Sequence, residues 1–482
     1  MTQQLRKDSI YILAAAIALL SGIQIVLLDP QPLFAFSILG GGGTGILIFW
    51  WLKTRVSVAG ALSIMGIAIL SGFLGSFAHV NAFINPLFNI IRWIAPCLLM
   101  LIGFRNIFSA KKIVEYISNL WGKISGPLLL FILYALSSAI YSPTPLVTIG
   151  RAATLTAITI GLAAALWPTI RCQADAETLL RLSAFIMALL ILPGQIYLFI
   201  PESEIGWHGT GRFRSTFWNP VTYSHLIALL LPLYWWISVD RHVKSLWRMF
   251  GKLMVALLLF NLLLTGSRSA TFAVLLSILL LSWYFASQNY RYLLNWLIVT
   301  LIILSIILLP QMVSGYFTRG FTIENLYQLT SSRIHQWERA LELWSNSPIL
   351  GYGFGNIGNT EQNLLFSNAS STLYSSTASL RLSNLYLETL ASSGLIGLTL
   401  LLYLVLKSFL MFSNYIKQVA YQKRFLMIMA YATFISGLVL NLSETWLVSA
   451  GSPFAMYWWF ILFIASRLES QLHSEKDTTC VY

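Results

Sequence analysis

Residues 249–286, MFGKLMVALLLFNLLLTGSRSATFAVLLSILLLSWYFA, consist of two apolar segments joined by the polar turn LTGSRSA at 264–270. A helix rises about 1.5 Å per residue, so roughly 20 apolar residues cross the hydrocarbon core of a bilayer. Each segment approaches this length, and the turn between them is short. The stretch therefore predicts two adjacent membrane-spanning helices.

Similar apolar segments recur along the whole chain. Of its 482 residues 57% are hydrophobic and 10% charged, whereas a soluble domain has about a quarter charged residues. We therefore predict an all-α, polytopic integral membrane protein with about 12–14 transmembrane helices and a long outer (periplasmic) loop that carries short helices. The first segment ends without a small-residue cleavage site, so we interpret it as a retained helix. The expected spans lie near 9–28, 31–51, 56–76, 83–104, 126–142, 149–168, 181–200, 219–238, 249–265, 268–286, 292–312, 385–407, 425–446 and 450–466.

Lysine and arginine collect in alternate loops. The segments 105–123, 241–252 and 407–424 hold the excess, as expected of loops on the inner side of a membrane. This pattern places both termini on the cytoplasmic side. The net charge of +13 is therefore an orientation signal and does not indicate nucleic-acid binding. The three cysteines suggest no disulfide or metal framework.

A small set of arginines lies on the outer side, where the orientation pattern does not require positive charge. Outer arginines do not set the topology, so they indicate an anion that is bound there. A guanidinium presents a rigid fork of donors that matches phosphate oxygens. The set consists of Arg151, Arg212, Arg214, Arg268, Arg319, Arg333, Arg339 and Arg381.

Two places in this set are the most informative. Arg268 lies in the turn 264–270, and because a charge buried against lipid is costly, it should face the protein interior or an aqueous cavity. Arg212 and Arg214 lie in the outer loop 201–219, where alternation in an extended stretch puts them on one side. With their aromatic neighbours they suit a diphosphate attached to sugars. In both places the alternative is binding of lipid headgroups.

A second outer loop, residues 311–383, is too long to be a simple connector, and such loops are usually functional. Within it, residues 332–345 have helical periodicity. They predict an amphipathic helix that lies on the outer leaflet, which is compatible with holding a lipid-linked substrate. Its apolar stripe is Ile334, Trp337, Leu341 and Trp344, and its opposite face holds His335, Arg339 and Glu342.

Glu388 falls about one turn inside the membrane edge of the span expected at 385–407. An intramembrane carboxylate is a candidate functional group, with Arg381 as its natural partner. The alternative is a salt bridge that fixes two helices. Residues 353–358, GFGNIG, match the GxGxxG pattern, but the strand and helix context of a dinucleotide-binding fold is missing. We therefore interpret this segment as a glycine-rich turn whose N–H groups approach an anion.

Three of these segments together resemble the O-antigen ligase and O-antigen polymerase superfamily. They are LLLTGSRSA at 262–270, RIHQWERALELWSNSPILGYGFGN at 333–356 and SNLYLETLASSGLIGLTLLLY at 383–403. The resemblance divides the chain into N-terminal transmembrane helices at 1–204, a ligase-like core at 205–410 that includes the outer loop 311–384, and C-terminal helices with a cytoplasmic tail at 411–482.

The resemblance implies a helical glycosyltransferase of a bacterial inner membrane that needs neither a cofactor nor a metal. Its partners would be a polyprenyl-diphosphate-linked glycan donor, a glycan or glycolipid acceptor and membrane lipids, and no nucleic acid. Carried over by motif, Arg268 would bind the diphosphate, with Arg214 or Arg212 as its partner. Arg333 and Arg381 are the further candidates for binding the diphosphate.

The chain departs from the superfamily at Ser383. Ligases commonly have His-Asn where this chain has Ser383-Asn384, and that histidine is the usual candidate for deprotonating the acceptor hydroxyl. Serine with no base beside it does not do this at neutral pH. The other candidates are His208, His335 and Glu388. This departure favours a polymerase-like or exopolysaccharide-handling member of the superfamily.

The leading prediction is a membrane glycan ligase or polymerase that transfers oligosaccharide from an undecaprenyl-diphosphate carrier to an acceptor hydroxyl, in O-antigen or exopolysaccharide biosynthesis. One alternative is a transporter of a small anion such as inorganic carbon. Transporter sites usually lie near the bilayer midplane, whereas these arginines lie near its outer edge. Another alternative is a non-catalytic component of a polysaccharide assembly.

Overall fold

The structure is a computed structural model that describes residues 124–167, 170, 172–200, 203, 206–209, 211–217, 219–240, 243–285, 336–357, 382–419, 424–449 and 452–472. The expected spans before residue 124 and the span at 292–312 lie outside these residues. So do four residues of the predicted sites, namely Arg319, Arg333, His335 and Arg381.

The described part of the chain is almost entirely helical. Five of its helical segments, Pro145–Ala163, Gln173–Phe199, Pro220–Val239, Ser245–Thr265 and Leu385–Gln418, are long and apolar enough to cross a membrane. The predicted all-α, polytopic membrane fold is thereby confirmed. The elements are α6 (Ser125–Ser137), η1 (Ser138–Ile140), α7 (Pro145–Leu166), α8 (Gln173–Ile191), η2 (Pro193–Phe199), β1 (Trp207–His208), β2 (Arg212–Phe213), α9 (Pro220–Val239), α10 (Ser245–Thr265), α11 (Arg268–Phe285), α15 (Leu385–Gln418), α16 (Arg424–Leu440) and α17 (Pro453–Leu472).

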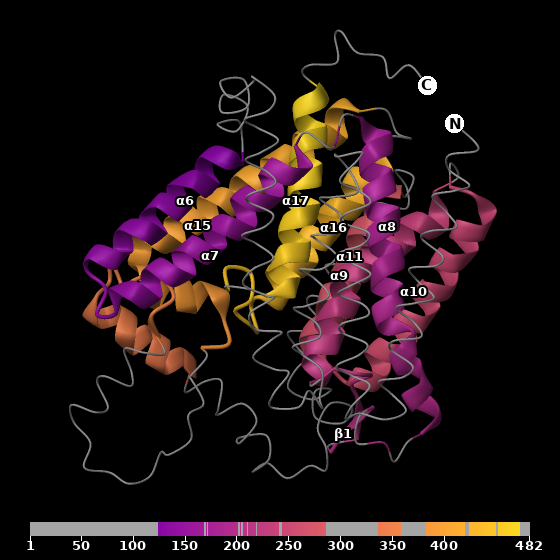
Figure 1. The fold of residues 1–482 in the computed structure, drawn as a ribbon, viewed down its shortest axis with the longest axis horizontal. Coiled ribbons are helices and arrows are strands. Elements are labelled where there is room, and N and C mark those ends of the chain that lie inside the picture. The colour runs from indigo at the N-terminus through magenta and orange to yellow at the C-terminus, as the bar shows by residue number, and fades with distance from the viewer. Residues whose placement is uncertain are drawn as a thin grey trace, which may run out of the picture.

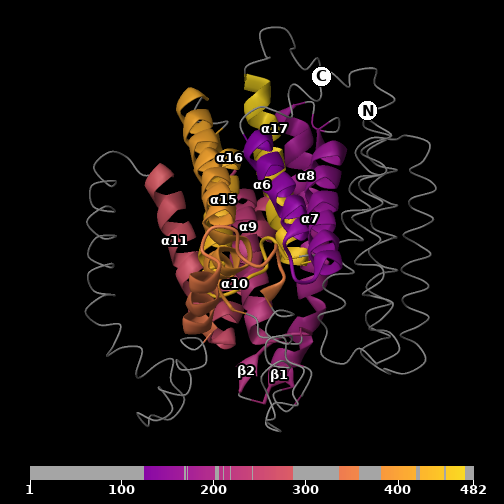
Figure 2. The same ribbon diagram turned by 90° about the vertical axis from the view of Figure 1, so that its left-hand side faces the viewer.

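Helix α9 lies at the centre of the bundle. It packs against α8, α10, α11, α16 and α17 (Figures 1 and 2). Within its apolar window 83% of the residues are buried, compared with 33% in α10 and α15. An all-apolar helix can pack against protein on every side, as α9 does. Helices α6, α7 and α15 form a separate flank that packs on α16 and α17 (Figure 1).

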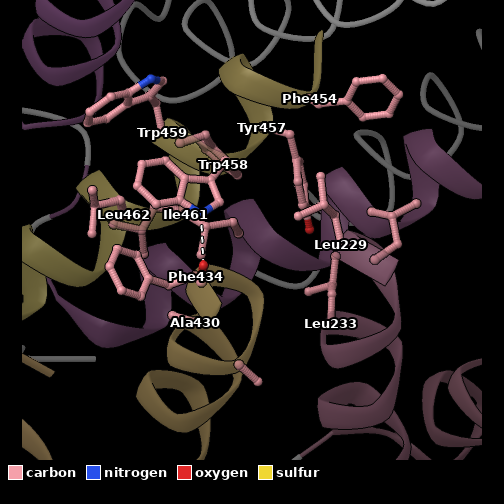
Figure 3. Packing of buried hydrophobic residues seen from close by; sticks show 14 of the residues in the cluster. Leu229, Leu233, Ala430, Phe434, Phe454, Tyr457, Trp458, Trp459, Ile461 and Leu462 are labelled. Carbon is pink, nitrogen blue, oxygen red and sulfur yellow. Dashed lines mark hydrogen bonds between the residues drawn. The ribbon is translucent and has the colours of Figure 1, made fainter. Parts of the chain in front are cut away.

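Aromatic side chains fill the space between α9, α16 and α17 (Figure 3). The Nε1 of Trp458 in α17 donates a 3.1 Å hydrogen bond to the carbonyl of Phe434 in α16, and the two rings stack at 5.2 Å. A Cβ on Gly437 would lie 2.2 Å from the ring of Trp458, so only glycine lets the indole approach this closely. This packing holds the part of the bundle to which the start of α15 is attached.

Several helix boundaries differ from those predicted. The span expected at 181–200 starts at Gln173, and α8 ends before Pro193, where the chain continues as the 3-10 helix η2. Proline lacks the N–H that an α-helix needs at such a position, so the helix stops there. Helix α15 extends to Gln418 and takes up part of the expected inner loop 407–424, whereas α16 ends at Leu440, short of the expected residue 446.

One end of the bundle gathers the segments singled out by the sequence. The β1–β2 hairpin, residues 336–357 and the start of α15 lie there (Figures 1 and 2), and so does the turn between α10 and α11, which β2 contacts. We call it the hairpin end. By the predicted orientation it faces the outer side of the membrane.

Candidate functional site

A short hairpin carries the first pair of predicted site residues. Strands β1 and β2 are antiparallel, and their register pairs Trp207 with Phe213 and His208 with Arg212. Directly opposite residues project to the same face of a two-stranded ribbon. His208 and Arg212 therefore share one face, and Trp207 and Phe213 share the other. Sequence reasoning named His208 and Arg212 separately, and the structure makes them neighbours.

The apolar face of the hairpin packs on Tyr223, near the start of α9. The ring of Phe213 lies edge-on to Trp207 at 5.2 Å and to Tyr223 at 6.0 Å, and Phe217 stacks on Tyr223 at 5.3 Å. Phe213, Phe217 and Tyr223 are fully buried. One tyrosine ring thus supports the aromatic residues on both sides of Arg214.

A buried polar network lies directly beneath this ring. The Tyr223 hydroxyl accepts hydrogen bonds from Gln195 Nε2 at 3.1 Å and from Asn261 Nδ2 at 2.8 Å, and Asn261 Nδ2 also donates to Gln195 Oε1 at 2.8 Å. These three side chains come from η2, α9 and α10. Hydrogen bonds between buried side chains are strong in a low-dielectric interior, so they favour the geometry in which they form. The network therefore ties Tyr223 to Gln195 of η2 and Asn261 of α10.

Two glycines allow the hairpin to lie close to η2. A Cβ on Gly194 would lie 1.7 Å from the Oγ of Ser215, and a Cβ on Gly206 would lie 2.2 Å from the Cβ of Tyr197. Trp207 Nε1 also donates to the Tyr197 carbonyl at 2.9 Å. The hairpin is therefore seated on the end of the α8–η2 segment.

Arg212 joins the hairpin to the turn between α10 and α11. Its Nε donates a hydrogen bond to the carbonyl of Thr265, the last residue of α10. Gly266 follows in the left-handed conformation with φ 57°, and α11 begins at Arg268. The two outer segments that the sequence predicted to bind one anion are thus in direct contact in the structure.

This junction concentrates positive charge. The first turn of a helix presents backbone N–H groups without helical partners, and the helix dipole makes this end positive. Arg268 is the first residue of α11, and Arg212 lies at the carbonyl of Thr265 just before it. Two guanidinium groups and a helix N-terminus together favour a phosphate-like anion. The hairpin–turn cluster, as we call Arg212, Arg214, His208 and residues 265–268, is the candidate site.

Arg214 extends the ladder of the hairpin by one further bond, since its N–H donates to the Gly206 carbonyl at 2.9 Å. The extended geometry that was expected over 212–214 is therefore present. Ser215 then turns the chain with a positive φ of 56°.

Glu388 belongs to a different group of elements. It lies in the first turn of α15, whose N-cap Asn384 accepts hydrogen bonds from the N–H groups of Tyr386 and Leu387. The N–H of Leu385 donates to the Asn441 carbonyl at 2.9 Å, so this turn is attached to the α16–α17 connection. Ser383, at the position of the expected histidine, has a positive φ of 45°.

The helix within the long loop is present, and its described part covers residues 336–346. Two residues of the predicted apolar stripe, Trp337 and Leu341, are 37% and 45% exposed and do not pack on the protein. Instead Ala340 and Leu343, each 1% exposed, pack in a cluster with Ala391 of α15. Arg339 pairs with Glu342 at 2.6 Å, as their placement on one face predicted.

The glycine-rich turn at 351–357 has a structural role that the sequence did not indicate. Gly351, Gly353 and Gly355 have φ of 70°, 97° and 70°, which side chains other than glycine rarely adopt. The N–H of Phe354 donates to Ser138 Oγ at 2.9 Å, and the N–H of Asn356 donates to the Gly353 carbonyl. Both N–H groups donate to acceptors within the protein. The prediction that they approach an anion is therefore wrong for these two groups.

Arg151, predicted as one of the outer arginines that bind an anion, has a structural contact. Its Nη1 donates to the carbonyl of Gly355, which attaches the glycine-rich turn to α7. Asn356 Nδ2 adds a bond to Ser142 Oγ at 3.0 Å. Arg151 is therefore one of the groups that hold residues 351–357 in place.

Sequence reasoning missed a break inside α15. Gly394 has φ 63° and ψ −167°, which are not helical values. The N–H groups of Leu395 and Ile396 donate instead to the carbonyls of Pro348 and Ile349, at 2.9 and 3.4 Å. The only signal was the Ser-Ser-Gly run at 392–394, which is also common in unbroken membrane helices.

Comparison with known proteins bears on the segment that contains this turn and α15. Residues 253–402 match the model of a family described as O-antigen ligase. The match confirms the resemblance seen in the sequence and supports an O-antigen ligase-like membrane enzyme that acts on glycans. The matched O-antigen ligase segment includes Arg268, Glu388 and Gly394, and it lies within the predicted core 205–410. The β1–β2 hairpin precedes it, and no curated protein matches the chain.

The described ranges contain no group of three or more His, Cys, Asp or Glu side chains that could hold a metal ion.

Proposed function

We propose that this protein transfers an oligosaccharide from a polyprenyl-diphosphate carrier to an acceptor sugar hydroxyl at the outer face of a bacterial inner membrane, in the synthesis of a cell-surface polysaccharide. One observation carries the proposal. Arg212 of the hairpin donates to the Thr265 carbonyl at the turn where α11 begins with Arg268. Two outer cationic segments thus form one cluster, next to or within the O-antigen ligase segment.

The arginines would act on the leaving group. In the transfer an acceptor oxygen forms a bond to the anomeric carbon while the bond from that carbon to the diphosphate oxygen breaks. Negative charge grows on the departing polyprenyl diphosphate, and fixed guanidinium groups stabilise it by several kcal/mol in a water-poor site. Each of the two arginines offers a planar fork of donors to the phosphate oxygens.

The proton of the acceptor hydroxyl needs a base. Among the three candidates, His208 is the one that the structure places beside an arginine of the hairpin–turn cluster, since it pairs across the hairpin with Arg212. A histidine near neutral pH can take up this proton, because its ordinary pKa is about 6.5. We assign this role to His208 ahead of Glu388, which lies at the α15–α16 junction. His335 keeps its place as a candidate.

Reconstituted protein tests the proposal most directly. Purified protein in liposomes receives an undecaprenyl-diphosphate-linked oligosaccharide and its acceptor, and the product is followed on a gel. Arg268→Ala should lower transfer by about 100-fold, as removal of one preorganised donor to a developing oxyanion does in other enzymes. Arg268→Lys keeps the charge but loses the fork, so it should recover only part of the rate. Arg248→Lys, near the other end of α10, is the matched control and should behave as wild type.

The pattern of products distinguishes a polymerase from a ligase. A ladder of lengthened glycans indicates a polymerase, and a single added unit on a glycolipid indicates a ligase. If folded wild-type protein gives no product from cognate donor and acceptor, or if Arg268→Ala transfers at the wild-type rate, the proposal is wrong. Uptake of bicarbonate by the same liposomes would then favour anion transport.

A further inference from the structure

We propose that residues 336–350 sit in the outer surface of the membrane, with a ridge of apolar side chains inserted among the acyl chains of the bilayer phospholipids. The ridge consists of Trp337, Leu341, Ile349 and Leu350. This inference concerns how the protein meets its membrane and does not depend on the proposed transfer reaction.

The helix over 336–346 has three distinct faces. At 100° per residue, Trp337 and Leu341 lie on one face and Ala340 and Leu343 on a second, which packs on the protein. The third face carries the ion pair of Arg339 with Glu342, which is 61% exposed. An ordinary amphipathic surface helix has only two faces, one against the protein and one in water. Trp337 and Leu341 therefore lie on a further face, which is apolar but does not pack on the protein.

Beyond the end of the helix, the next residues of the ridge are also apolar and exposed. Ile349 and Leu350 are 61% and 42% exposed, and Leu395 and Ile396 of α15 are 53% and 38% exposed. Backbone bonds from Leu395 and Ile396 to the carbonyls of Pro348 and Ile349 join the two segments. An apolar pocket of about 250 Å³ lies at this junction, lined by Ile349, Leu395, Ile396, Thr399 and Leu400.

The exposed side chains of α15 indicate what the ridge contacts. Helix α15 is long and apolar enough to cross a membrane, and its side chains Leu402, Leu406 and Leu410 are 48%, 55% and 47% exposed. Exposed leucines on a membrane-spanning helix face acyl chains. Because the ridge is continuous with this lipid-facing surface, acyl chains are the occupant that its position and chemistry fit.

The other two faces of the helix determine how deeply it lies in the membrane. Tryptophan is enriched where acyl chains meet headgroups, and an interfacial helix keeps its charged face in water while its apolar face dips a few ångströms below the headgroups. The Arg339–Glu342 pair therefore marks the water side and Trp337 the headgroup level. Since Ala340 and Leu343 pack in one cluster with Ala391 and Leu387, the first turns of α15, including Glu388, lie at the same level.

Spin labels on single cysteines in the full-length protein test this placement. In a background with Cys97, Cys172 and Cys480 replaced by serine, labels are placed at Leu341→Cys and Ile349→Cys on the ridge. Asn346→Cys, on the exposed water side of the same helix, is the matched control, and Leu402→Cys reports the lipid face of α15. Collision with oxygen, which concentrates in acyl chains, is compared with collision with a water-soluble nickel chelate, in liposomes of phosphatidylethanolamine and phosphatidylglycerol.

The expected result is that positions 341 and 349 resemble 402, with oxygen collisions several-fold above those at 346 and nickel collisions correspondingly lower. If positions 341 and 349 resemble 346, the ridge lies in water and the proposal is wrong. If neither reagent reaches them, another part of the protein covers the ridge and the proposal is equally wrong.

A second measurement needs no cysteine. Brominated phospholipids quench tryptophans that touch acyl chains, so the quenched fraction should fall when Trp337→Phe removes a ridge residue. Trp458→Phe removes a buried tryptophan that acyl chains do not reach, so it should not lower the quenched fraction. A Trp337→Phe variant that folds and is quenched like wild type would overturn the assignment.

Discussion

Tyr223 supports the hairpin through two different parts of its side chain. Its ring carries Phe213 and Phe217, and its hydroxyl accepts from Gln195 and Asn261. The two parts can be removed separately. Tyr223→Phe keeps the ring and removes the shared acceptor, which should cost about 1–3 kcal/mol of stability because the buried amides lose a partner. Transfer by the folded protein should stay within about threefold of wild type, since the hairpin still has its platform.

Tyr223→Leu removes the platform itself and should lower transfer by about tenfold or more, because Arg212 and Arg214 are no longer held in position. Thermal unfolding in detergent and the rate of transfer by the remaining folded protein check both variants. Equal rates for Tyr223→Phe and Tyr223→Leu would show that the ring does not position the arginines.

The sequence showed which side chains belong to the candidate site better than it showed what they contact. Arg212, Arg268 and His208 were recognised because charge on the outer side of a membrane protein needs an explanation. That His208 pairs with Arg212, and that Arg151 contacts Gly355, depends on chain reversals whose register no local pattern encodes. An arginine that binds a backbone carbonyl and one that binds a phosphate look alike in a sequence.

Among the elements, the break in α15 connects the long outer loop to the membrane helix. A Cβ on Gly394 would lie 2.1 Å from the Ile349 carbonyl oxygen, and the φ of 63° is costly for any other residue. Gly394→Ala should therefore separate the loop from the helix and cost at least about 2 kcal/mol.

The measurements are the apparent melting temperature and the rate of proteolysis within residues 336–357. Gly150→Ala is the matched control, since nothing lies within 4 Å of its added Cβ and alanine favours a helix by up to about 1 kcal/mol. A Gly394→Ala protein as stable and as resistant as Gly150→Ala would mean that α15 can close over the break as a regular helix.

Element boundaries show where sequence reasoning succeeds and where it stops. The spans at 219–238 and 268–286 agree closely with α9 and α11, because a proline after Asn219 and the polar turn at 265–268 mark their starts. The break at Gly394 and the exposed ridge at Trp337 depend on which neighbour a helix meets. Periodicity shows that a face is apolar, but it does not distinguish a face that meets protein from one that meets lipid.

The bundle as a whole is held at its other end by a separate set of contacts. Arg467 of α17 donates to the Ile170 carbonyl at 3.0 Å and lies 4.7 Å above the ring of Trp167, and Gln471 Nε2 donates to the same carbonyl at 2.9 Å. Arg467→Ala should lower stability by about 1–2 kcal/mol through loss of the hydrogen bond and the cation–π contact. Transfer by the folded fraction should not change, because the site lies at the hairpin end.

Melting temperature and the transfer rate per folded molecule check this expectation. Arg467→Lys, which keeps the charge without the planar group, should fall between wild type and Arg467→Ala. A loss of transfer with stability intact would show that the two ends of the bundle are coupled.

For the molecule as a whole, composition and charge alternation were sufficient to predict a helical membrane protein, and three short motifs were sufficient to indicate its family. The arrangement of the helices was not predictable in this way. Nothing in the sequence of α9 marks it as central except that it is apolar all round, a property that several neighbouring segments share. Which of them lies inside is decided by how closely they pack, as where a Cβ on Gly251 of α10 would lie 2.9 Å from the Tyr234 carbonyl oxygen of α9.

Two tyrosines, Tyr134 of α6 and Tyr141 just after η1, also have a consequence for the order in which the protein is made. Tyr134 donates to the carbonyl of Ser393 and Tyr141 to that of Leu350, across 259 and 209 residues of chain. A ribosome that adds 5–20 residues per second needs on the order of 10–50 s to make the partners after α6 has emerged. During that interval the two hydroxyl groups lack these carbonyl acceptors. By the predicted orientation, the flank formed by α6, α7 and α15 therefore closes only after the long outer loop has crossed to the far side of the bilayer, which makes translocation of that loop a step on which assembly of the bundle depends.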